Sequence, residues 1–387
     1  MRPDLPTGQP TRRAALLAAI AAATSMAGCT APVPQRSSSH TSALRLIGEA
    51  RIPFGKQFKG TTVGGLSGLD YDPVDDLWYA LSDDGSGANP ARLYTLKISV
   101  NADSIRAPQL MDVVILRRPD GTPFHGAPQG VIGPDPEAIR FNPASRTLLW
   151  TSEGDIRRVQ DPFVREMTLD GWHLREFTLP AMLKASVDLA TGPRHNLCLE
   201  GLALTAGGAG AWAAMEAPLQ QDGPVPGVGR PGGPCRFTLF DTATGHAIRQ
   251  LAYMPDAIPR APALPGGFAD NGVSEILMID AHRMLVLERA YMAGVGNSLR
   301  VYEIDTRHGS DTLALDTLME GGFSPSAKTL VLDFANSGLM QLDNTEAMAW
   351  GPLLAGGGRS LVFLSDDNFN PGQITQFAAF EFQEQTS

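Results

Sequence analysis

Acidic and hydroxyl side chains recur at one position of a repeated segment in this chain. Each segment has Ser or Glu near its start, then usually a small residue, then alternating apolar positions. These residues are Ser67, Glu137, Glu200, Glu275 and Glu346, at successive steps of 70, 63, 75 and 71 residues. A second carboxylate ends an apolar run 16, 16, 16, 13 and 20 residues later, at Asp83, Glu153, Glu216, Glu288 and Asp366. Such self-similarity is the signature of a repeat architecture.

The two rows of side chains are expected to meet at one rim, because the start of the first strand of a hairpin lies beside the end of the second. Asp84, Asp367 and Asn368 extend the rows. Crowded carboxylates raise one another's pKa or require a cation. Oxygen ligands suit Ca²⁺, whereas zinc favours imidazole and thiolate. The candidate calcium ligands are Glu137, Glu200, Glu275, Glu346, Asp83 and Asp366.

A structural role for the same carboxylates is the alternative. An acidic residue in each unit can accept N–H bonds from the neighbouring unit and tie the units together. Both roles remain open at this point, and they can hold at different units. Arg289, directly after Glu288, is a candidate clamp for an anionic substrate, since the guanidinium group suits planar anionic oxygens.

Most of the repeated units hold four short strand-like runs separated by turns, which is typical of the blades of a β-propeller. The sequence therefore predicts an all-β fold with five blades. The last unit has only three runs, whereas a spare run, Ala43–Ala50, precedes the first unit. Pairing of this run with the last unit would close the ring and remove two free sheet edges. A sixth blade within the long connections at 100–135 or 305–345 is the alternative.

The first 29 residues are typical of an export signal and not of the fold. Arg12 and Arg13, which resemble a twin-arginine signal, precede an alanine-rich stretch. That stretch is well short of the roughly 20 apolar residues of a membrane-spanning helix. Met26-Ala27-Gly28-Cys29 resembles a lipobox, in which the cysteine is lipidated. We therefore expect a lipid anchor at Cys29 in the cell envelope, a flexible tether at 30–42 and a propeller at 43–387.

Charge and cysteine content narrow the partners and the compartment. The formal net charge of −10 argues against a nucleic-acid partner, which would require a basic surface. Cys198 and Cys235 remain after Cys29. Export would place them in an oxidising compartment, where they form either a disulfide or two separate buried thiols.

Several motifs resemble the phytase-like family known as esterase-like activity of phytase. They are Gly64-Gly65-Leu66-Ser67-Gly68-Leu69, Ala80-Leu81-Ser82-Asp83-Asp84-Gly85, Asp135-Pro136-Glu137-Ala138-Ile139, Arg194-His195-Asn196-Leu197-Cys198-Leu199-Glu200-Gly201-Leu202, Leu287-Glu288-Arg289 and Leu364-Ser365-Asp366-Asp367-Asn368. The resemblance implies a secreted propeller and a Ca²⁺-dependent phosphoester hydrolase.

Two functions remain open from the sequence. The first is a monomeric exported hydrolase that acts on a small anionic phosphoester or carboxylic ester at the acidic rim, with Glu137, Glu200 and Arg289 as its catalytic residues. The second is a non-catalytic binding or scaffold propeller of the cell envelope, since the propeller fold by itself does not imply an activity.

Overall fold

Almost every regular element of the structure is a β-strand, because the sequence consists of short runs of alternating apolar and polar residues that end in turns. The computed structural model describes residues 40–124, 133–187 and 189–386. Within these ranges the helices are short 3-10 turns: η1 (Ile156–Arg158), η2 (Ala181–Leu183), η3 (Ala206–Gly208), η4 (Gln220–Asp222) and η5 (Phe334–Asn336). None of the described helices is long and apolar enough to cross a bilayer.

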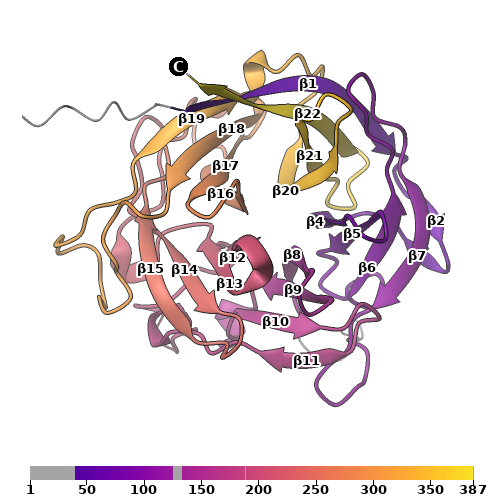
Figure 1. Ribbon diagram of the computed structural model, residues 1–387. Coiled ribbons are helices and arrows are strands. Elements are labelled where there is room, and N and C mark those ends of the chain that lie inside the picture. The colour runs from indigo at the N-terminus through magenta and orange to yellow at the C-terminus, as the bar shows by residue number, and fades with distance from the viewer. Residues whose placement is uncertain (1–39, 125–132, 188, 387) are drawn as a thin grey trace, which may run out of the picture. The chain divides into compact units, whose positions relative to one another are not determined.

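The strands form five four-stranded antiparallel sheets arranged as a ring, which confirms the five-bladed propeller (Figure 1). Blade 1 consists of β4 (Leu66–Asp72), β5 (Leu77–Ser82), β6 (Arg92–Lys97) and β7 (Gln109–Ile115). Blade 2 consists of β8 (Pro136–Asn142), β9 (Thr147–Ser152), β10 (Phe163–Met167) and β11 (His173–Glu176). Blade 3 consists of β12 (Leu199–Leu204), β13 (Gly210–Met215), β14 (Cys235–Asp241) and β15 (Ala247–Tyr253). Blade 4 consists of β16 (Ala269–Met278), β17 (Arg283–Met292), β18 (Gly296–Asp305) and β19 (Lys328–Asp333).

Blade 5 closes the ring as predicted. It contains β20 (Asn344–Leu353), β21 (Arg359–Asp366), β22 (Thr375–Thr386) and the first strand of the domain, β1 (His40–Ile52). β1 pairs antiparallel with β22, so the two ends of the domain lie in one sheet (Figure 1). β1 begins at His40, inside the segment expected as a tether. A small separate hairpin, β2 (Gln57–Phe58) and β3 (Thr61–Thr62), connects β1 to blade 1.

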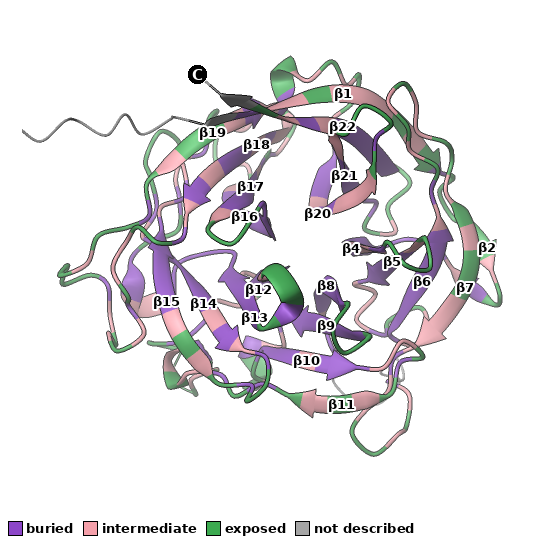
Figure 2. Cartoon of the chain, viewed as in Figure 1, coloured by how far each residue is buried: buried purple, intermediate pink, exposed green. Residues whose placement is uncertain are grey.

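Five hydrophobic clusters hold the ring together, one between each pair of adjacent blades. Successive side chains of a strand point to opposite faces of its sheet. On β5, Trp78 and Ala80 therefore pack toward blade 5, whereas Tyr79 and Leu81 pack toward blade 2. The inner strands are buried and the outer strands are more exposed (Figure 2). Each blade is thus fixed on both faces by its neighbours.

The innermost strands β4, β8, β12, β16 and β20 surround the centre of the ring, and each contacts the innermost strands of both adjacent blades (Figure 1). Each of them also carries a β-bulge, where two residues face one on the second strand. The bulge lies near the first residues of β4, β8, β12 and β20 and in the middle of β16. Bulges re-aim side chains and are frequent next to functional sites. In this propeller they position the residues at the rim.

Candidate functional site

The inner row at the rim consists of the extra residues of the five bulges. The pairing registers identify these residues as Ser67, Glu200, Ser274 and Glu346 in four blades. In blade 2 both Glu137 and Ala138 lie between the flanking pairs, and Glu137 occupies the equivalent position directly after the first pair. Four of the five are the predicted residues. In blade 4 the prediction of Glu275 is wrong by one position, because the register shifts between Val273 and Glu275 and makes Ser274 the bulged residue.

The outer row is also displaced by one position in blade 4. The backbone N–H of Asp83, Glu153 and Glu216 donates to the carbonyl of the residue two positions before the bulge. The matching pairs in the last two blades are Arg289 with Gly272 and Asp366 with Asn344. Arg289, and not Glu288, therefore occupies the fourth position of the outer row. The spacing of 13 residues between Glu275 and Glu288 was the sequence signal of this shift, because it differs from the 16 residues of the first three blades. Ser274 and Arg289 are 15 residues apart, which is closer to that value.

Glu275 lies away from the rim, in the core of the ring. Its carboxylate pairs with Arg140 at 2.7 Å and accepts the N–H groups of Leu202 and Ile276 at 2.9 Å. Burial raises the pKa of Glu275 to about 7, although Arg140 opposes the rise. We therefore remove Glu275 from the set of candidate calcium ligands.

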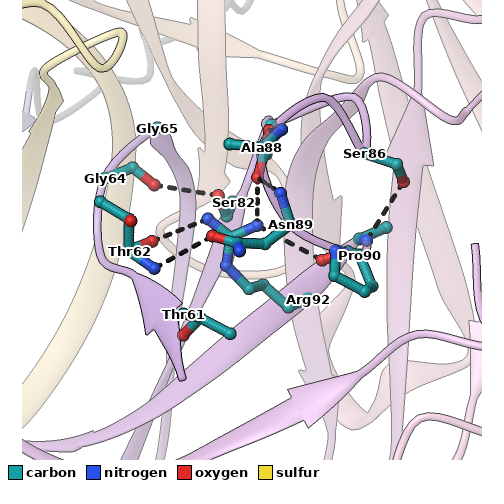
Figure 3. Close-up of polar contacts among 12 residues, drawn as sticks. Thr61, Thr62, Gly64, Gly65, Ser82, Ser86, Ala88, Asn89, Pro90 and Arg92 are labelled. Carbon is teal, nitrogen blue, oxygen red and sulfur yellow. Dashed lines mark hydrogen bonds and ion pairs between the residues drawn. The ribbon is translucent and has the colours of Figure 1, made fainter. Parts of the chain in front are cut away.

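Three other carboxylates that the sequence placed in or beside the rows are structural ties. Asp84 accepts N–H bonds from Ala88 and Asn89 and pairs with Arg92. The guanidinium group of Arg92 also donates to the carbonyl of Thr62 (Figure 3). Glu288 is bound by Tyr253, Asp256, Asn271 and Lys328. Asp367 accepts from Gly65, Phe369 and Thr375. The structural role holds at these positions.

Most of the remaining carboxylates line a cavity of about 450 Å³ at the mouth of the propeller, whereas Glu153 and Asp366 do not line it. Its acidic lining residues are Asp83, Asp135, Glu137, Glu200, Glu216, Asp270 and Glu346. The side chains of Asp83, Asp135, Glu137 and Glu200 have no hydrogen-bond partner among the described residues, in contrast to the structural ties above. Asp135 and Asp270 were not among the site residues predicted from the sequence, although Asp135 begins one of the motifs that resemble the phytase-like family. Asp135 directly precedes the repeated segment of blade 2, which is the signal that could have revealed it.

The acidic side chains come close enough to share a cation. Oxygens lie within 4.8 Å of one another in three groups: Asp83, Glu346 and Asp366; Asp135, Glu137 and Glu153; Glu153, Glu200 and Glu216. Burial is the main cause that raises the pKa of each of these groups, and neighbouring carboxylates raise most of them further. The pKa of Asp135 rises to about 6 and that of Glu216 to about 8. Ionisation of these carboxylates is therefore unfavourable in the protein without a bound cation.

Arg289 is a basic residue placed among these acids. Its guanidinium Nη2 lies 3.5 Å from Glu216 and 3.7 Å from Glu346, and these carboxylates raise its pKa against the effect of burial. Its Nε is buried without a hydrogen-bond partner among the described residues. The guanidinium group therefore has N–H donors that are not used within the protein, and the two carboxylates fix its orientation. Both properties are needed to bind an anion.

Glycines allow the carboxylates to lie directly against the backbone. A Cβ on Gly272 would lie 2.5 Å from Cγ of Glu216, and a Cβ on Gly65 would lie 2.2 Å from Oδ1 of Asp83. Gly65 also has a φ of 59°, a conformation that residues with a Cβ rarely adopt. Both positions therefore require glycine for the observed geometry of the rim.

The two cysteines are separate buried thiols and do not form the disulfide considered from the sequence. Cys198 directly precedes β12 and Cys235 is the first residue of β14, and β13 lies between these strands. Two strand spacings separate the backbones by roughly 9–10 Å, beyond the reach of a disulfide. The Sγ atoms donate to the carbonyls of Arg194 and Glu216. The expected signal peptide, the expected lipidation site Cys29 and most of the expected tether lie outside the described residues.

Similar solved structures share little sequence with the chain. Kuenenia stuttgartiensis hydrazine synthase is 12% identical, with 81% of each chain covered and a TM-score of 0.38. The periplasmic gluconolactonase of Pseudomonas aeruginosa is 14% identical, with 90% of this chain and 96% of that chain covered and a TM-score of 0.34. Saccharomyces cerevisiae Sqt1 is 11% identical, with 79% and 68% covered and a TM-score of 0.30.

No curated protein matches the chain. The phytase-like family described as "Esterase-like activity of phytase" matches residues 61–369, a span that contains the bulged residue of all five blades. The chain therefore belongs to this phytase-like family.

Proposed function

We propose that the mouth of the propeller is the active site of a Ca²⁺-dependent hydrolase that acts on a phosphoester, with a carboxylic ester as the second choice. The observation that carries the proposal is the position of Arg289. One guanidinium group replaces the carboxylate of the outer row in blade 4 and faces a cavity lined by seven acidic residues. A guanidinium group would not help a site that binds only cations, whereas it can bind an anionic group of a substrate.

The residues at the mouth fit calcium. The candidate ligands are Asp83, Glu137, Glu200, Glu346 and Asp366, all of which offer hard oxygen donors. Oδ2 of Asp366 is buried without a hydrogen-bond partner among the described residues. The carboxylates with raised pKa would be stabilised in their charged form by a divalent cation. When bound, the ion would supply Lewis-acid stabilisation of charge on the substrate.

The side chains of the mouth then have separate tasks. Arg289 binds and orients the anionic group of the substrate, and Glu216 and Glu346 hold the guanidinium in place. Burial raises the pKa of Glu137 and of Glu200, and neighbouring carboxylates raise both further, so each side chain binds a proton more readily than an exposed carboxylate does. A carboxylate with such a pKa suits the acceptance of a proton from an attacking water molecule.

A hydrolysis screen with 4-nitrophenyl phosphate and 4-nitrophenyl acetate, in Ca²⁺ and in EDTA, tests the proposal. We expect Ca²⁺-dependent release of nitrophenol that Glu200→Gln abolishes. The control is Glu176→Gln, because Glu176 is a surface carboxylate on β11 with a side chain that is 50% exposed. An unchanged rate in Glu200→Gln would refute the site. Absence of hydrolysis of both esters would leave the binding or scaffold propeller as the function.

We also propose that the protein is exported as a monomer and anchored in the cell envelope by a lipid on Cys29. The support is the lipobox-like sequence before Cys29. Metabolic labelling with a fatty acid should mark the wild type and leave Cys29→Ser unlabelled. Labelling of both forms, or of neither, would refute the anchor.

A further inference from the structure

A second cavity continues the mouth of the propeller. It has a volume of about 500 Å³ and shares Phe268, Asp270, Arg289 and Asn368 with the first cavity. Arg289 thus lies where the two cavities meet. A molecule whose anionic end reaches Arg289 has room to extend into the second cavity.

The polar lining of this second cavity is dominated by neutral amides with unused hydrogen-bonding groups. Oδ1 of Asn297 is buried without a partner among the described residues. The side-chain amides of Asn368 and Asn370 also line the cavity. Among the described residues, the Asn368 side chain and the Nδ2 of Asn370 have no hydrogen-bond partner. An amide offers both donors and acceptors, so it complements a hydroxyl group without introducing charge.

Two exposed aromatic rings flank the amides. The exposed fraction is 63% for Phe268 and 36% for Tyr291. Their centroids lie 6.2 Å apart with an interplanar angle of 36°. Both residues line the second cavity. Exposed aromatic surface beside amides suits a ligand with both apolar C–H faces and hydroxyl edges.

Charge in the second cavity argues against a further anionic group. Arg289 is the only Lys or Arg among its lining residues. The carboxylate of Asp343 accepts from the N–H of Asn344 and Ile374, and Asp270 accepts from the N–H of Tyr291. A second phosphate would meet two acids and no free cation in this cavity.

We propose that the second cavity is a subsite for a neutral polyhydroxylated group, such as a sugar ring, which is attached to the anionic group held by Arg289. This inference rests on the proposed function for the anionic half of the substrate. It narrows the substrate class to phosphate or carboxylate esters of sugars or similar polyols, with a single anionic group at the reacting end.

Direct binding of neutral sugars tests the subsite apart from catalysis. Glucose, cellobiose, maltose, trehalose and myo-inositol would be titrated into the protein in Ca²⁺ buffer and observed by ligand-detected NMR and calorimetry. We expect saturable binding of at least one, weakened at least about fivefold by Phe268→Ala and by Asn297→Leu, as loss of one stacking or hydrogen-bonding contact implies. The control is Trp172→Ala, an exposed aromatic residue on the loop before β11.

Hydrolysis of glucose 6-phosphate and n-hexyl phosphate provides the second readout, since both carry one phosphate and only the first carries hydroxyls. We expect kcat/KM to favour the sugar phosphate by about tenfold, and Asn297→Leu to collapse this ratio. Equal kcat/KM for the two esters, without binding of any sugar in the panel, would overturn the subsite and leave the proposed function standing. Sugar binding that the variants weaken, without hydrolysis of either ester, supports the subsite and removes the proposed function.

Discussion

The buried ion pair of Arg140 and Glu275 should be the main polar contact that holds the five blades in register. Arg140 lies on β8 and is 2% exposed, and Glu275 lies on β16 and is fully buried. The guanidinium group donates to the carbonyls of Leu69, Ile276 and Met348 at 2.8–3.1 Å. Glu275 accepts from Leu202. With β8 itself, the pair therefore reaches the innermost strand of every blade.

Arg140→Met should destabilise the protein by about 4 kcal/mol. Removal of one partner of a buried pair leaves an uncompensated charge, at a cost of about 3–5 kcal/mol. The carbonyls that Arg140 binds would also lose their charged donor. Glu275→Gln should cost less, about 2 kcal/mol, because the guanidinium keeps its carbonyl acceptors. Both losses are large against a total stability of about 5–15 kcal/mol.

Urea unfolding of the wild type, both single variants and the double variant Arg140→Met/Glu275→Gln would measure these values. The double variant should cost clearly less than the sum of the single variants, with a coupling energy of at least about 1 kcal/mol. Additive losses would show that the two side chains act independently. A loss below about 1 kcal/mol for Arg140→Met would refute the reasoning altogether.

Three further predictions concern the rim and the thiols. The raised pKa values of Asp135 (about 6) and Glu216 (about 8) mean that the folded protein binds more protons than the unfolded chain above the ordinary carboxylate pKa. In EDTA the melting temperature should therefore fall as the pH rises from about 5 to about 8. Ca²⁺ should restore more stability at about pH 8 than at about pH 5, and scans at both pH values that show no effect of Ca²⁺ would remove calcium from the proposal. Gly272→Ala should lower the free energy of unfolding by about 1–3 kcal/mol, because its Cβ would overpack against Glu216, and it should lower the rate of hydrolysis. A variant with wild-type stability and a wild-type rate would contradict the geometry. Cys198 and Cys235 are buried with raised thiol pKa values, so Ellman's reagent should label them only after unfolding, and rapid labelling of the folded protein would disprove their burial.

The fold was predictable from the sequence because the same strand pattern occurs in each of the repeated units. Every blade has its own alternating runs, and the spare run at Ala43–Ala50 had one unit left to complete, so β1 closes blade 5 as expected. The repetition of the pattern also predicted the positions of most of the site residues. In blades 1, 2 and 3 both rows keep the common spacing of 16 residues, which the bulges reproduce.

Blade 4 shows what the sequence could not decide. The pattern Ser274-Glu275 permits either residue at the bulge, and a shift of one position sends every following side chain to the opposite face of the sheet. Only the packing of β16 against its neighbours selects Ser274, sends Glu275 to Arg140 and brings Arg289 into the outer row.

The sequence by itself therefore determined the propeller fold, the closure of the ring and the edge at which the carboxylates gather, because these follow from strand period and spacing. It favoured five blades, and the structure excluded a sixth among the described residues. Only the tertiary structure decided which carboxylates face the cavity and which tie the blades together. It also separated the two thiols by one strand and joined the mouth to a second cavity. These features depend on contacts between residues remote in the chain, such as Arg140 and Ile276, which are 136 positions apart, and no local pattern encodes them.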